Sequence, residues 1–295
     1  MNHVVIAGGT GFVGRALAAE FLERGTDVVI LSRGGGVVEG ATTARWDGNP
    51  EGEWTSHLDG AKAVVNLCGA AIANKWTAAW RDEVYRSRVE PTEALGKAVA
   101  KSASPPKLWI NASGVGYYGN TGDTSLSEAS PAGKGFLAET CVDWESACLE
   151  APAPRTHKLV LRLGVVLARE GGAFVEFKKI PCGGIGSGRQ WISWVHLDDV
   201  RRMVSWAVDN PFDGAVNCCA PDPVTNAQFF RQLGSRRGLP PLPPMPEFVF
   251  RAAAAAMGKE ASVVLEGQRV SPVVAQARGF NFQFPDLQSA LDDLL

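Results

Sequence analysis

The sequence predicts an α/β protein built on a Rossmann-type, doubly wound parallel sheet with a smaller, mainly helical C-terminal lobe. Short apolar runs alternate along the chain with segments whose apolar residues fall at helical spacing, a pattern typical of βαβ units. A glycine-rich turn joins the first apolar run to the first helical segment. With 295 residues, of which 45% are apolar, the chain is long enough to bury a large core.

The first apolar run, residues 4–7, leads into the turn Gly8-Gly9-Thr10-Gly11-Phe12-Val13-Gly14, and a helical pattern follows to Arg24. Glycines at such a turn let the strand reverse sharply and let backbone N–H groups approach a pyrophosphate. The helix N-terminus adds partial positive charge at the same place. Residues 1–30 therefore predict a dinucleotide site, with an ordinary tight turn as the alternative.

The second apolar run, residues 27–31, ends at Ser32-Arg33-Gly34. NAD-binding folds carry a carboxylate at the end of this strand, which holds the ribose 2′-hydroxyl. The guanidinium of Arg33 can instead pair with a 2′-phosphate through its planar fork. The sequence favours NADP over NAD, and a solvated loop position remains the alternative for Arg33.

Further strand-like runs are predicted at residues 63–67, 108–112, 159–163 and 215–219, and helices at residues 77–101 and 137–150. This alternation predicts right-handed crossovers between parallel strands. We assign residues 1–219 to an NADP-binding domain, with residues 165–189 contributing to a substrate lobe. Residues 220–295 form the small C-terminal lobe on the substrate side.

The net charge of −2 and the pI near 6.1 provide no broad basic field, which excludes nucleic acid and an anionic membrane surface as expected partners. No apolar run approaches a membrane-spanning length, and none at the N-terminus has the form of a secretory signal. We expect a cytoplasmic protein that acts on a small molecule, as a monomer or a homodimer.

Cysteine and histidine residues show no ligand pattern. The six cysteines, at positions 68, 141, 148, 182, 218 and 219, include no C-x-x-C pair, and the four histidines are scattered. We expect reduced packing cysteines and no metal site.

The turn at Gly8 and the segments 64–69, 109–113 and 161–166 resemble, in order and spacing, the extended short-chain dehydrogenase/reductase superfamily, the sugar-nucleotide epimerases and dehydratases. The chain is more narrowly similar to an atypical branch, the YfcH-like epimerase-family proteins. The motifs shared with that branch are Ser32-Arg33-Gly34-Gly35, Lys75-Trp76-Thr77, Ser87-Arg88-Val89, Gly116-Tyr117-Tyr118-Gly119, Gly186-Ser187-Gly188-Arg189-Gln190 and Gly267-Gln268-Arg269-Val270.

The resemblance implies a bilobal molecule that binds NADP(H) and holds its substrate between the lobes. The cofactor contacts that it implies are Gly8, Thr10, Gly11, Phe12, Val13, Ser32, Arg33, Leu67, Cys68 and Gly69. Arg88 stands where the superfamily has an asparagine under the active site, so the alignment predicts that Arg88 lies beside the cofactor.

The superfamily's chemistry depends on a Tyr-x-x-x-Lys pair one helical turn apart, in which the lysine lowers the pKa of the tyrosine. The matching stretch here is Phe136-Leu137-Ala138-Glu139-Thr140, and neither Phe136 nor Thr140 can transfer that proton. Redox catalysis by the usual mechanism is therefore not expected from these positions.

Substitute proton donors follow a predicted strand at the sheet edge where ligands bind in such folds. Ser113 matches the superfamily residue that hydrogen-bonds the reacting oxygen, and Tyr117 or Tyr118 can replace the missing phenol. Aromatic packing within the loop is the alternative for both tyrosines.

Two further motifs carry polar chemistry. The loop Gly183-Gly184-Ile185-Gly186-Ser187-Gly188-Arg189 offers backbone amides and a guanidinium, a combination suited to an anionic substrate group, while a simple connection between lobes is the alternative. We therefore predict Arg189 as a substrate contact. In His196-Leu197-Asp198-Asp199 we expect Asp198 or Asp199 to cap a helix rather than to bind a metal.

Two hypotheses of function follow. The first is an NADP(H)-dependent oxidoreductase or epimerase-like enzyme that acts on a small, nucleotide-sugar-like substrate, with Ser113 and a tyrosine handling the oxygen. The second is a non-catalytic NADP(H)-binding sensor or scaffold, which the residues at positions 136 and 140 favour.

Overall fold

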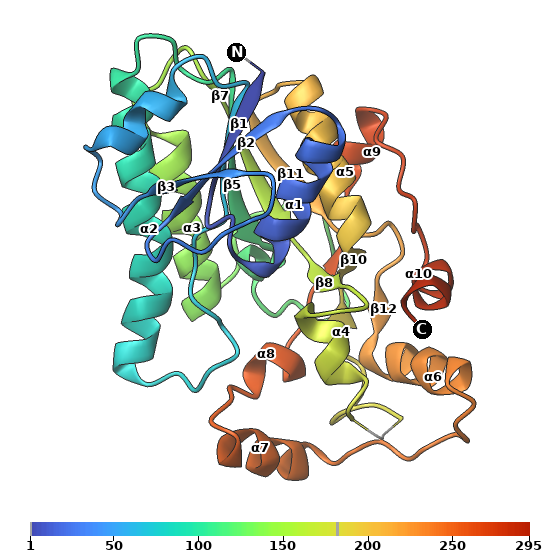
Figure 1. Cartoon of the computed structure of the whole chain (residues 1–295). Coiled ribbons are helices and arrows are strands. Elements are labelled where there is room, and N and C mark those ends of the chain that lie inside the picture. The colour runs from blue at the N-terminus through green and yellow to red at the C-terminus, as the bar shows by residue number, and fades with distance from the viewer. Residues whose placement is uncertain (1, 181–182) are drawn as a thin grey trace.

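A parallel sheet of seven strands forms the centre of the molecule (Figure 1). The structure is a computed structural model that describes residues 2–180 and 183–295. In spatial order the strands are β3 (Thr42–Arg45), β2 (Asp27–Ser32), β1 (His3–Ala7), β4 (Ala63–Asn66), β5 (Leu108–Gly114), β7 (His157–Leu163) and β11 (Gly214–Cys218). The order reverses between β1 and β4, and in open α/β sheets a ligand crevice forms at such a point, at the carboxyl ends of the strands.

Helices cover both faces of this sheet, which explains why its central strands are continuously apolar. One face is covered by α1 (Phe12–Glu23), α5 (Leu197–Asp209) and α9 (Val273–Ala277). The other is covered by α2 (Ala78–Lys101), α3 (Phe136–Leu149) and the 3-10 helix η1 (Glu53–Leu58). In β1, Val4 and Ile6 face the layer of α1, α5 and α9, whereas Val5 and Ala7 face the layer of α2 and η1. The predicted doubly wound fold is confirmed.

A second hydrophobic core lies below the carboxyl ends of the strands in Figure 1. Trp194, Phe229 and Leu291 are fully buried in it. Its helices are α4 (Gly172–Phe177), α6 (Asn226–Arg236), α7 (Glu247–Ala256), α8 (Ser262–Leu265) and α10 (Leu287–Leu294). Short strands complete this part and its junction with the sheet: β6 (Ser125–Leu126), β8 (Val165–Leu167), β9 (Trp191–Ile192), β10 (Trp194–His196), β12 (Val224–Thr225) and β13 (Arg269–Val270).

The chain after residue 219 contributes buried side chains to both hydrophobic cores. Most of its helices belong to the second core, which confirms the helical C-terminal part. However, Ala275 of α9 and the following Phe280 pack into the core of the large sheet. The division of the chain into two domains at residues 219 and 220 stays a prediction. The last part of the chain returns to the sheet at α9 and then forms α10 in the second core.

Two backbone hydrogen bonds join the loop after β4 to the segment after α7. Lys75 N donates to Gly258 O at 2.8 Å, and Glu260 N donates to Ala73 O at 2.9 Å. Asn74 and Lys259 form an antiparallel bridge between them. The second core is therefore tied to the sheet on the side of α2 as well as through the main chain.

Helix α5 shows that the predicted capping residue was wrong. His196, not an aspartate, is the N-cap, and its Nδ1 accepts from Asp198 N at 3.1 Å. The carboxylate of Asp199 is fully buried and accepts from the backbone N–H groups of Gln283 and Phe284, at 2.7 and 2.9 Å. Sequence spacing could not show this role, because the two donors are far along the chain from Asp199.

Asp199→Ala is expected to lower the free energy of unfolding by about 2 kcal/mol, because the buried N–H of Phe284 and the N–H of Gln283 would lose their acceptor. Urea denaturation measures the loss, and faster proteolysis of the C-terminal segment should accompany it. Asp198→Ala is the matched control, since Asp198 is partly exposed and donates its own N–H to the cap. Equal losses for the two variants would contradict the anchoring role of Asp199.

Candidate functional site

Two positions at the turn between β1 and α1, Gly8 and Gly14, leave no room for a side chain. Gly8 has a φ of 74°, and a Cβ at this residue would lie 3.0 Å from the carbonyl carbon and oxygen of Leu67. A Cβ on Gly14 would lie 2.6 Å from the Cα of Gly9, so α1 packs directly on the turn. The turn therefore brings backbone to the surface of the crevice, as a pyrophosphate site requires.

The N-terminus of α1 is open at this turn. Gly11 is its N-cap and is exposed, and no side chain caps the helix. Thr10 O accepts from Arg15 Nε at 2.9 Å, which fixes the turn, while the half-buried Val13 packs into the sheet core. The ring of Phe12, 36% exposed, covers the Gly171–Gly172 backbone. An anion at this helix terminus would meet unpaired N–H groups and the positive end of the helix dipole.

The end of β2 carries a cation and no carboxylate. Ser32 is half-buried at the last position of the strand, and Arg33 is exposed immediately after it. Arg33 lies close enough to the loop after β4 to lower the pKa of Cys68, although burial has the larger effect and raises that pKa to about 12. This is the place where a dinucleotide-binding fold meets the adenosine ribose.

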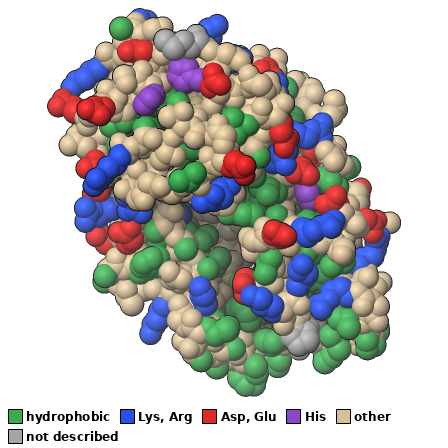
Figure 2. Space-filling model, in the orientation of Figure 1, with side chains coloured by type: hydrophobic (Ala, Val, Ile, Leu, Met, Phe, Trp, Pro, Cys, Tyr) green, Lys and Arg blue, Asp and Glu red, His purple; other side chains and the backbone are tan. Residues whose placement is uncertain are grey.

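The loop after β4 forms the other wall of the crevice. Leu67 N donates to Ala7 O at 2.9 Å, and Cys68 N donates to the side chain of Asn66 at 3.1 Å. A Cβ on Gly69 would lie 3.1 Å from Cζ of Arg88. Figure 2 shows the surface hollowed in the middle of this face, between the part of the molecule around the sheet and the second core.

Arg88 reaches this loop from α2. Its Nη1 donates to Val84 O at 2.8 Å and its Nη2 to Ala70 O at 3.0 Å. Its Cζ lies 5.2 Å from the centre of the Trp144 ring. The structure thus places the half-buried Arg88 beside Gly69. Its place beside the cofactor stays a prediction.

The positions of the usual tyrosine and lysine hold no proton donor of comparable acidity. Phe136 opens α3, and its ring lies 5.2 Å from the ring of Trp76, with Cζ of Arg81 5.1 Å from its centre. Thr140 is buried, and its hydroxyl donates to Phe136 O at 2.7 Å. An aromatic wall with a guanidinium therefore stands where redox members of the superfamily have their catalytic pair.

Ser113 belongs to a buried polar network. Its hydroxyl donates to Glu145 Oε1 at 2.7 Å. Glu145 also accepts from Arg162, with Oε1 2.9 Å from Nε and Oε2 2.7 Å from Nη2. The two side chains of this ion pair are only 6% and 5% exposed. Sequence reasoning missed Glu145 and Arg162, although an arginine within the apolar strand β7 indicates a buried partner.

The two tyrosines have different environments. The hydroxyl of Tyr118 donates to Asn217 Oδ1 at 2.7 Å and accepts from Arg162 Nη1 at 2.9 Å. Tyr118 is fully buried, and this burial raises its pKa to about 12. Tyr117 is half-buried, with Cζ of Arg162 3.5 Å from the centre of its ring. The network therefore occupies the hydroxyl of Tyr118, whereas Tyr117 contributes its ring.

Several backbone amides of the loop at residues 183–189, which we expected to face an anion, are paired within the protein. Gly183 N donates to Pro243 O, Gly186 N to Met245 O, and Ile185 N to the side chain of Asn226. The loop is a structural connection to the proline-rich segment. Arg189 remains exposed, 3.6 Å from Asp123.

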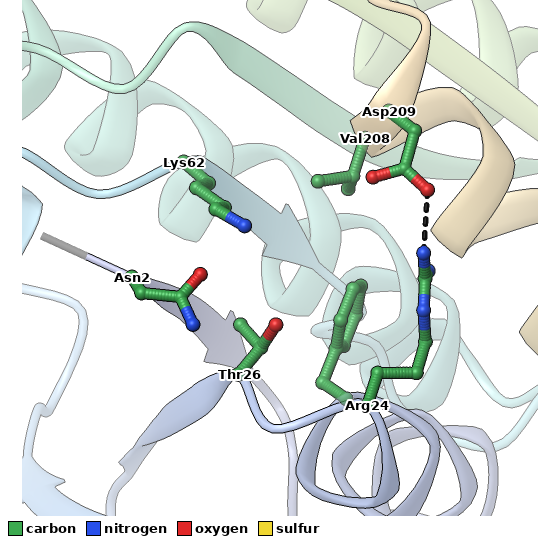
Figure 3. Close-up of a pocket in the computed structure, with 7 residues that line it drawn as sticks. Asn2, Arg24, Thr26, Lys62, Val208 and Asp209 are labelled. Carbon is green, nitrogen blue, oxygen red and sulfur yellow. Dashed lines mark hydrogen bonds and ion pairs between the residues drawn. The ribbon is translucent and has the colours of Figure 1, made fainter.

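A small hollow lies at the opposite edge of the sheet (Figure 3). Asn2, Thr26 and Lys62 line it next to the amino ends of β1, β2 and β4, and Arg24 pairs with Asp209 beside it at 2.5 Å. Its volume is about 130 Å³, below the usual size of a small-molecule site. It is also remote from the glycine turn, so it does not belong to the crevice.

The sequence analysis also made predictions about metal sites, membrane spans and cysteines. Among residues 2–180 and 183–295, no group of three or more histidine, cysteine, aspartate or glutamate side chains is arranged to hold a metal ion. In the same part of the chain, no helix combines the length and apolar character needed to cross a bilayer. The described cysteines are free, with Cys68 half-buried and the others buried; Cys182 lies outside the described residues.

Comparison with known proteins supports this geometry. Residues 4–136 match the "NAD dependent epimerase/dehydratase family", and residues 245–294 match a "Domain of unknown function (DUF1731)". The chain is 37% identical to "Epimerase family protein SDR39U1" of Bos taurus over 99% of each chain. It is 36% identical to the chloroplastic SDR39U1 homolog of Arabidopsis thaliana, over 98% of this chain and 85% of that one.

The crystal structure of human SDR39U1 (isoform2) with NADPH superposes with a TM-score of 0.88 and 35% sequence identity, covering 99% of this chain and 98% of that one. The fold, the glycine turn and the end-to-end similarity agree with one another. The chain therefore belongs to the epimerase family of NAD-dependent epimerases and dehydratases, in the SDR39U1-like branch of the extended short-chain dehydrogenase/reductase superfamily.

Proposed function

We propose that the protein binds NADP(H) in the crevice at the carboxyl edge of the sheet. The observation that carries this proposal is the glycine-only turn beside the uncapped N-terminus of α1, with Arg33 in place of a carboxylate at the end of β2. The human relative crystallised with NADPH supports it. The residues present fit the group: amides of the turn would hold the pyrophosphate, and Arg33 the 2′-phosphate.

We further propose that the protein is an oxidoreductase or epimerase-like enzyme for a small, nucleotide-sugar-like substrate. NADPH, when bound, supplies a hydride to a carbonyl carbon. The protein must then orient the oxygen of that carbonyl and deliver a proton to it. Because Phe136 and Thr140 cannot do this, the task falls to residues at the end of β5, where Ser113 and Tyr117 lie.

Ser113 can act as a positioning residue in this scheme. Its proton is directed to Glu145, whose charge is compensated by Arg162. The oxygen of Ser113 can therefore accept from a hydroxyl group of the substrate but does not itself donate to the carbonyl oxygen, so that the proton must come from another residue. Tyr117 is the better candidate for the proton donor, since the hydroxyl of Tyr118 already has two partners.

Tyr117→Phe is expected to lower turnover by at least about 100-fold while leaving the Kd for NADPH unchanged. Tyr118→Phe should also leave cofactor binding intact, and its main effect should be on stability, because Asn217 and Arg162 each lose a partner. Steady-state kinetics and calorimetric titration separate the two effects. Full turnover by the Tyr117 variant would remove it as the donor.

A non-catalytic sensor or scaffold that reports cofactor state is the second candidate. The buried Thr140 hydroxyl, bound to the backbone of Phe136, favours it, because no proton donor stands at the usual place. Oxidation of bound NADPH in the presence of a panel of aldehydes, ketones and nucleotide sugars discriminates the two. Repeated turnover supports the enzyme, and tight binding without turnover across the panel supports the sensor.

The remaining expectations stay predictions: a cytoplasmic location, a small-molecule partner with an anionic group near Arg189, and a monomer or homodimer. The guanidinium of Arg189 carries most of the prediction of an anionic group, because several of the loop amides are paired within the protein. Sedimentation of the purified chain determines its oligomeric state.

A further inference from the structure

Arg88 carries a charge that no carboxylate balances within the described residues. Both of its assigned hydrogen bonds go to neutral backbone oxygens, those of Val84 and Ala70. Among the described residues, the thiol of Cys141 lies close to Arg88, and burial raises the pKa of this thiol, so that it carries no charge at neutral pH. Glu145 lies in the same helix as Cys141, but its charge is already compensated by Arg162. A net positive charge therefore remains beside Gly69, in the loop after β4.

Because this guanidinium is partly buried, its charge is less screened by solvent than that of an exposed arginine. Arg88 is half-buried against the ring of Trp144, and burial lowers its pKa from the ordinary value of arginine. Arginine nevertheless stays protonated in proteins. Because water and salt screen such a charge less than an exposed one, it acts on whatever binds beside it.

Arg88 and Arg33 lie on opposite sides of the point where the strand order reverses. Arg33 lies at the end of β2, on the side where the adenosine part of a dinucleotide binds. Arg88 lies on the other side of the sheet reversal, against Gly69 in the loop after β4. A dinucleotide that crosses the crevice from Arg33 and over the glycine turn has its nicotinamide half on the side of Arg88.

We propose that Arg88 makes the site select the reduced dinucleotide, NADPH, over NADP⁺. The proposal rests on the function proposed above, since it concerns the same site. The nicotinamide ring of NADP⁺ carries a positive charge and that of NADPH is neutral, while the rest of the two molecules is the same. With an effective dielectric constant of about 20, one unit charge within about 8 Å of another changes affinity by tenfold or more.

This selectivity has a consequence for both candidate functions. An enzyme with this site binds NADPH in preference to NADP⁺ and releases the oxidised cofactor readily. A sensor with this site responds to the ratio of NADPH to NADP⁺ rather than to their sum. Arg88 is thus a specificity-determining residue in either case.

The test is parallel calorimetric titration of the full chain with NADPH, NADP⁺ and 2′-phospho-ADP-ribose, which lacks nicotinamide. The wild type should bind NADPH at least about tenfold more tightly than NADP⁺. Arg88→Met should bring the ratio of the two Kd values close to one, mainly by tightening NADP⁺, without changing the Kd for 2′-phospho-ADP-ribose. Arg88→Lys keeps the charge and should keep most of the ratio.

Arg86→Met is the matched control, because it removes the same charge from the same helix on its exposed face, where Arg86 pairs with Glu90. A wild-type ratio near one overturns the proposal, as does an unchanged ratio in the Arg88→Met variant. If that variant does not fold, Arg88→Gln provides the same comparison. If the wild type binds none of the three ligands, the proposed NADP(H) function itself fails, whereas binding without discrimination overturns only the role of Arg88.

Discussion

Glu145→Ala is expected to lower the free energy of unfolding by about 4 kcal/mol, because Arg162 would remain buried without its carboxylate partner. Both side chains of this pair are almost completely buried, and Ser113 would lose its acceptor at the same time. Urea denaturation followed by circular dichroism measures the change in stability.

The double variant Glu145→Ala/Arg162→Met separates the cost of an unpaired charge from the loss of packing. It should be more stable than Glu145→Ala alone, since no uncompensated charge remains. Glu90→Ala serves as the control for an exposed pair and should have no measurable effect, because Arg86 and Glu90 are each 56% exposed. A Glu145→Ala variant as stable as the wild type would contradict the stabilising role of this buried ion pair.

Arg33→Asp is expected to weaken NADPH binding by about 100-fold, because a carboxylate replaces the cation that would face the 2′-phosphate. The affinity for NADH should change by less than about threefold, since NADH lacks this phosphate. Calorimetric titration of the wild type and the variant with each dinucleotide gives the four dissociation constants.

Arg33→Lys provides the control for charge without the planar fork, and it should retain NADPH with a moderate loss of affinity. Equal losses of NADPH and NADH in the Arg33→Asp variant would contradict the assignment of Arg33 to the 2′-phosphate. They would indicate that the substitution disturbs the loop after β2 as a whole.

The fold could be predicted because its signals are local. Continuous apolar strands and helical periodicity between them define a doubly wound sheet, and the glycine turn fixes where the first strand meets the first helix. The structure adds the physical reason for the glycines at positions 8 and 14: a residue with a Cβ atom at either position would collide with neighbouring backbone. The return of α9 to the sheet could not be predicted, because its partner strand β11 is distant in sequence.

The candidate site could be predicted only in part, for the same reason. Arg33 could be named from the end of the second predicted strand, whereas Gly69 and Arg88 are implied by the resemblance to the family. The pairing of Glu145 with Arg162 joins a helix to a strand, and no local pattern specifies it. In the loop at residues 183–189, the amides of Gly183 and Gly186 are paired by a proline-rich segment far along the chain, which composition alone could not show.

The central claim is that the crevice is an NADP(H) site. Calorimetric titration of the purified wild-type chain with NADPH and NADH in parallel, after any cofactor that co-purifies has been removed, tests it most directly. The account predicts saturable binding of NADPH with a stoichiometry of one per chain and a clear preference over NADH. No binding of either dinucleotide would contradict it, and the glycine turn would then be a purely structural feature of the fold.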